Sequence, residues 1–131
     1  MTLKETFDVF FANTNGQKVE VSDQTNFGQC MDLAYLFTFC LGFPKDTIRH
    51  LYAYEVYTSP SDLTRQYFDL FPNTPTFVPQ AGDLVVFNKT ATNIAGHIGI
   101  SNGVGDMNSF VSFDQNFPVG SAPKLVTHTY T

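Results

Sequence analysis

Two residues of this chain, Cys30 and His97, have side chains that could carry out nucleophilic chemistry together. Cys30 follows a polar loop that ends at Asn26, and it begins an apolar run with helical spacing. The free N–H groups at a helix start carry partial positive charge, which favours the thiolate, the nucleophilic form of cysteine. The pattern predicts a reactive thiol, although Cys30 by itself also fits a small buried core residue.

His97 lies between two glycines, in the stretch Gly96-His97-Ile98-Gly99. A glycine inside a strand reduces stability and typically marks a position where another group approaches the backbone closely. We therefore expect the ring of His97 to face an open groove. If this strand pairs with the next, Asp114 at the end of that next strand lies near the imidazole. A carboxylate there orients the ring and makes it more basic.

The elements that must position these side chains follow a helix-then-strand order. We expect helices over residues 3–12, 28–41, 46–57 and 62–71, and strands over residues 83–87, 94–101, 108–114 and 125–130. Pro72, Pro75 and Pro79 exclude regular structure from residues 72–80, and Asn102-Gly103 predicts a turn. This order predicts an α+β fold, with N-terminal helices packed on a C-terminal antiparallel sheet.

Three residue types mark the expected helix ends. Asn26 is expected to cap the helix that carries Cys30, and Ser61 is expected to cap the last helix. Gly42 is expected to end the cysteine helix, because glycine readily adopts the left-handed conformation found there.

Length and composition predict one domain with a substantial core. The chain has 131 residues, of which 43% are hydrophobic and 15% charged, too little charge for a disordered protein. Its net charge of −5 argues against nucleic-acid binding, which requires basic patches. Residues 1–6 are too polar for a signal peptide, and no run reaches the roughly 20 apolar residues of a membrane span.

The remaining cysteine and histidines are interpreted as structural. Cys30 and Cys40 are separated by about 15 Å of expected helix, too far for a disulfide, so both thiols are predicted to be free. Cys40 is expected to be inert and buried in the core. His50 is expected to be a packing or surface residue, and His128, which alternates with threonines on a late strand, is expected to face solvent.

Four stretches, in order, resemble one known family. They are Phe27-Gly28-Gln29-Cys30-Met31-Asp32-Leu33, Pro79-Gln80-Ala81-Gly82-Asp83-Leu84-Val85-Val86-Phe87, Gly96-His97-Ile98-Gly99-Ile100 and Asp114-Gln115-Asn116-Phe117. The chain is similar, over about residues 23–117, to the cysteine- and histidine-dependent amidohydrolase/peptidase (CHAP) domains, peptidoglycan hydrolases common in bacteriophage lysins. The resemblance implies a papain-like fold and hydrolysis of a peptidoglycan amide through a thioester.

The resemblance also implies roles for particular residues. Cys30 corresponds to the nucleophile, His97 to the base and Asp114 to the acidic residue that orients it. Asn116 corresponds to an asparagine often counted as a fourth member, and Gln29 lies where it could help to hold an oxyanion. The cleaved bond is either the amide between N-acetylmuramic acid and L-alanine or one within the stem peptide or cross-bridge. We expect a pH–activity limb from His97 near neutrality.

A calcium site is the one cofactor that the resemblance raises. Some family members bind calcium in an acidic loop before the nucleophile, where this chain offers Asp23 and, beyond the cysteine, Asp32. Calcium requires six or more oxygen ligands, so two carboxylates do not make a site obvious. We favour the alternative that Asp32 is a first-turn carboxylate stabilised by the helix dipole, and we expect no cofactor.

A second function class remains open alongside the enzyme. The domain could be a catalytically silent virion or wall-binding module that keeps the fold. In either case, the net negative charge of the domain does not attract it to anionic cell walls. The expected partner is therefore a separate cell-wall-binding domain or a phage tail protein. Without a signal peptide, a phage-encoded lysin is expected in the host cytoplasm and then at the wall, or in the virion.

Overall fold

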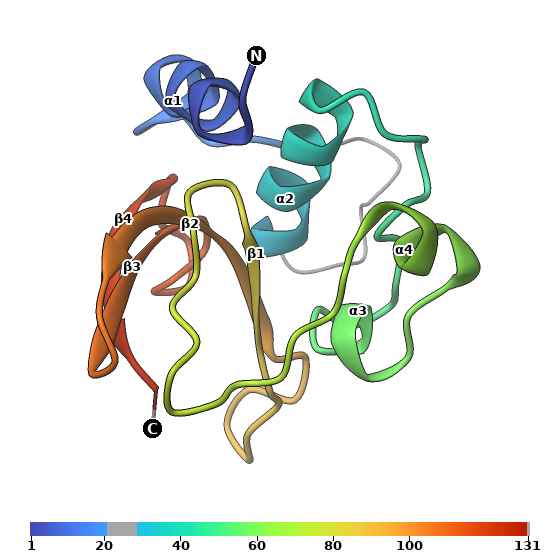
Figure 1. The fold of residues 1–131 in the computed structure, drawn as a ribbon, viewed down its shortest axis with the longest axis vertical. Coiled ribbons are helices and arrows are strands. Elements are labelled where there is room, and N and C mark those ends of the chain that lie inside the picture. Colours follow the sequence, from blue (N-terminus) through green and yellow to red (C-terminus); the bar gives the residue numbers. More distant parts are fainter. Residues whose placement is uncertain (21–28, 131) are drawn as a thin grey trace.

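Helices precede strands along the chain, as the sequence pattern predicted (Figure 1). A computed structural model describes residues 1–20 and 29–130, with Gln29 described for its backbone alone. The described helices are α1 (Leu3–Thr14), α2 (Gln29–Cys40), α3 (Glu55–Thr58) and α4 (Asp62–Tyr67). The described strands are β1 (Leu84–Phe87), β2 (His97–Gly105), β3 (Ser109–Asp114) and β4 (Lys124–Thr129). The α+β fold class is therefore confirmed.

The strands form one curved antiparallel sheet in the order β1-β2-β3-β4 (Figure 1). His97 is paired with Phe87, and Ile100 with Phe113. Because successive side chains of a strand point to opposite faces, Ile98, Ile100 and Phe113 share one face and His97 lies on the other. The first face packs against helices, and the second is left for polar chemistry.

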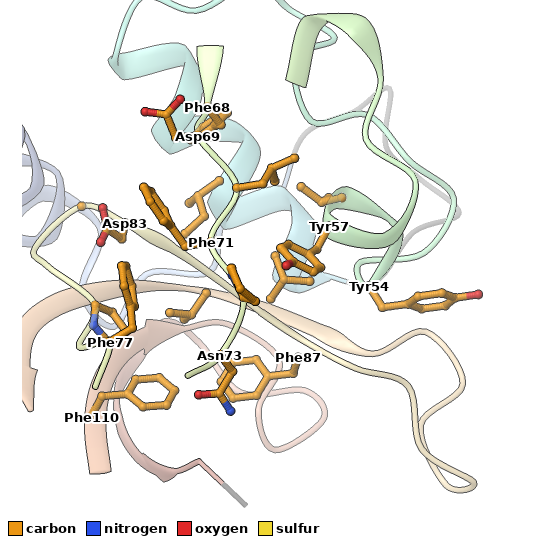
Figure 2. Close-up of a pocket in the computed structure, with 18 of the residues that line it drawn as sticks. Tyr54, Tyr57, Phe68, Asp69, Phe71, Asn73, Phe77, Asp83, Phe87 and Phe110 are labelled. Atoms are coloured by element: carbon orange, nitrogen blue, oxygen red, sulfur yellow. The ribbon is translucent and has the colours of Figure 1, made fainter. Parts of the chain in front are cut away.

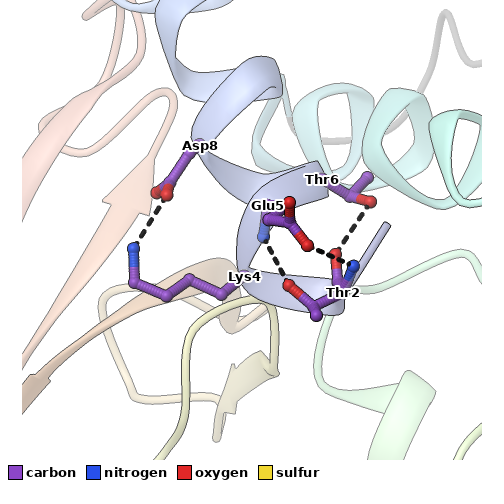
Figure 3. Close-up of polar contacts among 5 residues, drawn as sticks. All are labelled: Thr2, Lys4, Glu5, Thr6 and Asp8. Atoms are coloured by element: carbon purple, nitrogen blue, oxygen red, sulfur yellow. Dashed lines mark hydrogen bonds and ion pairs between the residues drawn. The ribbon is translucent and has the colours of Figure 1, made fainter.

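Helix α1 is fixed at its start by a reciprocal cap (Figure 3). Glu5 N–H donates to Thr2 Oγ1 at 3.1 Å, and Thr2 N–H donates to Glu5 Oε1 at 2.9 Å. These bonds satisfy donors that a helix start otherwise leaves free. The cap holds α1 in the orientation that buries Phe7 and Phe10, whose rings contact Phe113 of the sheet.

Helix α2 is the central element of the core. Met31, Leu33 and Phe37 are at most 1% exposed, and they pack partly against α1 and partly against β2. The expectation that Cys40 is buried is wrong: Cys40 is exposed, although Phe37 and Thr38 in the same turn of α2 are buried. None of the described helices has the length and apolar character needed to cross a membrane.

The expected helix over residues 46–57 forms only in its last part, as α3. Residues 45–48 and 53–54 form turns instead. The N–H of Tyr54 donates to Ala95 O at 3.2 Å, so a contact with the segment before β2 replaces a helical hydrogen bond. The helix expected over residues 62–71 ends at Tyr67, and its predicted cap by Ser61 is confirmed.

The turn expected at Asn102-Gly103 is also wrong. Strand β2 continues through these residues to Gly105. They lie in an irregular stretch of the pairing with β3, where the register shifts between Ser101 and Gly105. The chain reverses instead after Asp106, whose Oδ1 accepts hydrogen bonds from the N–H groups of Asn108 and Ser109. The proline-rich residues 72–80 contain no helix or strand, as predicted.

We predict that Phe37→Ala destabilises the domain by about 3–5 kcal/mol, because it removes a completely buried ring between α1 and α2. Phe39→Ala on the same helix is the matched control. Phe39 is 69% exposed, so its loss should change the free energy of unfolding by no more than about 0.5 kcal/mol. Urea unfolding of both variants measures the difference, and equal effects would contradict the packing described for α2.

Candidate active site

Cys30 lies in the first turn of α2 and is 6% exposed. It packs in a cluster with Met31 and Ile98, which holds the helix start against the beginning of β2. The partial positive charge of the helix start surrounds the sulfur. The predicted cap at Asn26 lies outside the described residues, as does the side chain of Gln29.

His97 is the first residue of β2, and its side chain lies between Cys30 and Asp114. The Cys30 thiol and the imidazole line the same cavity, and the interaction with Cys30 raises the pKa of His97. Its Nε2 atom lies 3.4 Å from Asp114 Oδ2, and it has no shorter polar contact among the described residues. Because Nε2 faces Asp114, Nδ1 is the nitrogen left for the thiol. The structure therefore brings these three predicted residues together.

Asp114 is completely buried at the end of β3. Its Oδ1 accepts a hydrogen bond from Ser112 Oγ at 2.7 Å, and its Oδ2 lies 2.6 Å from His128 Nε2. Burial by itself raises the pKa of this carboxyl, but hydrogen bonds from His128 and His97 hold the pKa below its usual range. Asp114 is therefore ionised at neutral pH despite its burial.

The basicity of His97 follows from its two neighbours. Burial by itself lowers the pKa of the imidazole, but the hydrogen bonds with Asp114 and Cys30 raise the pKa to about 9. The ring therefore carries its proton at neutral pH. This moves the titration expected near neutrality to a higher pH, because a buried anion stands directly behind the ring.

Gly99 marks a close approach of another group to the backbone, as the sequence predicted, and that group is the Asp114 carboxylate. A Cβ atom at this position would overlap Asp114 Oδ1, so glycine leaves room for the buried carboxylate. At Gly96, φ is +68° and the carbonyl of Phe87 approaches closely. Gly99 thus makes room for the carboxylate, whereas Gly96 and His97 both line the open cavity.

Asn116 lies in the turn that follows β3. Its φ is +62°, its Oδ1 accepts a hydrogen bond from Gly120 N–H at 2.6 Å, and its own N–H donates to Ser121 O. The hydrogen bonds of Asn116 in the described part of the chain thus shape this turn. Its assignment as a fourth catalytic residue stays a prediction.

His128 is the site residue that the sequence reasoning missed. It was expected to face solvent, but its side chain is 9% exposed, bonded to Asp114, and surrounded by the rings of Phe87, Phe110 and Phe117. The available signal was strand pairing: His128 pairs with Phe110, which lies on the same face of β3 as Asp114. The alternation of His128 with threonines correctly indicated that His128 and the threonines lie on opposite faces of β4. The face that carries His128, however, is not exposed.

The cavity at this site has a volume of about 490 Å³. Its walls come from the start of α2, from residues 92–97 and from residues 116–119. A second cavity of about 710 Å³ runs along β1 and is lined by aromatic side chains, including Phe71, Phe77 and Phe87 (Figure 2). The larger cavity includes neither Cys30 nor His97, so the chemistry assigns the reactive site to the smaller one.

Of the two carboxylates considered as calcium ligands, the structure describes only Asp32. Asp32 lies in the first turn of α2 and is 5% exposed, while Asp23 lies outside the described residues. Within residues 1–20 and 29–130, no three His, Cys, Asp or Glu side chains gather so that they could hold a metal ion. The position of Asp32 fits a carboxylate in the positive field of a helix start.

A buried thiol and imidazole at the junction of a helix and an antiparallel sheet, backed by a carboxylate, define an α+β protein with a cysteine–histidine site. In comparison with known families, the CHAP domain model matches residues 20–116, and this chain belongs to that family. A curated relative is "Probable autolysin PH" of Staphylococcus aureus (strain NCTC 8325 / PS 47), which is 33% identical over 89 residues. The match covers 68% of this chain and 18% of that protein.

We predict that stability falls between pH 6.5 and about 9. The pKa of His97 rises from 6.5 to about 9 on folding, so its contribution is complete below pH 6.5 and is lost as the pH rises through 9. The contribution amounts to at most about 3–4 kcal/mol. Urea unfolding across this range measures it, and His97→Gln should flatten the curve. A wild-type curve as flat as that of the variant would contradict the prediction.

We predict that Gly99→Ala displaces the Asp114 carboxylate, and that the pKa of His97 falls towards 6.5 as a result. NMR titration of the imidazole measures this. Overpacking should also destabilise the fold by about 1–3 kcal/mol. Ile98→Val, on the opposite face of β2, is the control: it should destabilise by about 1 kcal/mol and leave the His97 titration unchanged. An unaltered His97 pKa in Gly99→Ala would refute the close approach.

Proposed function

We propose that this CHAP domain hydrolyses an amide bond of bacterial peptidoglycan, with Cys30 as nucleophile and His97 as its proton-transfer partner. The observation that carries the proposal is that these two side chains line one open cavity, with Asp114 Oδ2 lying 3.4 Å from Nε2 of the imidazole. Family membership and the relative named as an autolysin support a cell-wall substrate.

The first half of the proposed reaction forms a thioester. With its pKa at about 9, His97 carries a proton at neutral pH, and a protonated imidazole beside a sulfur stabilises the thiolate. The thiolate attacks the amide carbonyl, and the C–N bond breaks as His97 donates its proton to the leaving amine. Asp114 holds the ring so that Nε2–H points to the carboxylate and Nδ1 faces the reacting atoms.

The second half releases the product and restores the site. A water molecule gives a proton to the now neutral His97 and attacks the thioester, and the sulfur leaves as thiolate. The oxyanion formed in each half is stabilised by N–H groups at the start of α2, which have no helical acceptor. Gln29 is proposed to add a further donor there.

The setting of the activity is a finer proposal. We propose a lysin that cleaves either the N-acetylmuramoyl-L-alanine amide or a bond of the stem peptide or cross-bridge, in a phage endolysin or a virion-associated lysin. The matched region is 18% of the autolysin, so in that relative the domain is one part of a longer protein. We propose that a separate wall-binding domain or tail protein brings this domain to the anionic cell wall, because its net charge of −5 does not attract it there.

We predict that Cys30→Ser and His97→Ala each reduce hydrolysis of purified peptidoglycan at least about 1,000-fold, because each removes a group that takes part in bond making. Cys40→Ser is the matched control and should keep full activity. Mass spectrometry of the released muropeptides measures activity and identifies the cleaved bond. Hydrolysis that persists in both Cys30→Ser and His97→Ala would overturn the mechanism.

Alkylation by iodoacetamide provides a separate readout and distinguishes the enzyme from a catalytically silent module. Cys30 is 6% exposed and Cys40 is exposed, so accessibility alone favours Cys40. An activated thiolate reverses that order, and Cys30 should then react faster. Slower labelling of Cys30 than of Cys40 would favour the silent module.

A further inference from the structure

His128 contacts the same carboxylate oxygen that faces His97. Its Nε2 lies 2.6 Å from Asp114 Oδ2, whereas His97 Nε2 lies 3.4 Å from that atom. We infer that His128 is a positioning residue, which holds the Asp114 carboxylate in the orientation that makes it act on His97. The inference rests on the proposed function, because it assigns a further residue to the same site.

The hydrogen bonds of Asp114 show which groups set its orientation. A carboxylate can rotate about the bond to its Cβ unless both oxygens are held. Ser112 Oγ holds Oδ1 at 2.7 Å, and His128 holds Oδ2 with the shorter of the two imidazole contacts. The carboxylate is therefore anchored by two groups that do not meet the thiol, and it is presented to His97 already oriented.

The surroundings of His128 fix its ring. The rings of Phe87, Phe110 and Phe117 have their centres 4.6, 5.4 and 5.2 Å from the imidazole centre. Phe87 and Phe117 also contact the ring of His97, at 5.3 and 4.9 Å. The two imidazoles thus share one aromatic enclosure, which excludes water from Asp114 and strengthens each hydrogen bond.

The geometry specifies what His128 must supply. Asp114 is an ionised acceptor, so His128 has to present an N–H at its Nε2 position. His128 needs no charge for this, and no described contact links His128 to Cys30. Glutamine can place an amide N–H at a similar distance from the backbone, whereas phenylalanine fills the aromatic enclosure without a donor. The two substitutions therefore separate the hydrogen bond from the packing.

The experiment compares His128→Phe with His128→Gln in peptidoglycan hydrolysis and in thermal unfolding. We expect His128→Phe to lower kcat about ten- to a hundred-fold with KM changed less than about two-fold, since one charge-assisted hydrogen bond is lost behind the base. His128→Gln should recover kcat to within about three-fold of wild type. His50→Gln and His50→Phe are the matched controls, and both should keep kcat.

Three outcomes would overturn the inference: full kcat in His128→Phe, equal loss in both His128 variants, or a loss confined to KM. If His128→Phe does not fold, His128→Leu takes its place. NMR titration of His97 keeps the test independent of the proposed function. His128→Phe should lower the His97 pKa from about 9, and an unchanged pKa there would refute the positioning role. Inactivity of the wild-type protein would refute only the hydrolase.

Discussion

The site depends on keeping one carboxylate ionised inside the protein. Asp114 has no exposed surface, and a buried charge is strongly unfavourable unless hydrogen bonds and opposite charges compensate for it. Ser112, His128 and His97 provide that compensation from three strands, and Gly99 provides the space. Strands β2, β3 and β4 therefore have to pair in one register for the charge to be tolerated, so the same interaction ties the fold to the chemistry.

The two faces of the sheet divide packing from chemistry. One face carries aliphatic and aromatic side chains that bury α1 and α2, and this packing fixes where the start of α2 lies. The other face carries His97, Asp114 and His128 among aromatic rings. Cys30 can meet His97 because that histidine is the first residue of β2, and the next residue, Ile98, packs in the same cluster as Cys30. The reactive pair thus lies at the boundary between a rigid core and a cavity.

Local patterns predicted much of this arrangement, and tertiary contacts account for what they missed. The helix that carries Cys30 and the strand that carries His97 follow from short-range periodicity. The proximity of Asp114 to His97 follows from the pairing of neighbouring strands. The burial of His128 does not, because β4 alternates like a half-exposed strand and only the aromatic rings opposite it close that face. The exposure of Cys40 does not follow from local patterns either, because its apolar spacing matches that of the buried residues of α2.

The sequence by itself determined the α+β order, the helix that presents the thiol and the three residues that the structure brings together, because hydrophobic period and strand order act over short distances. Tertiary structure alone decided that β2 runs through Asn102-Gly103, that residues 46–54 form no helix, and that a second histidine shares the carboxylate of Asp114. These features depend on the curvature of the sheet and on contacts between distant segments, which leave no periodic signal in the chain.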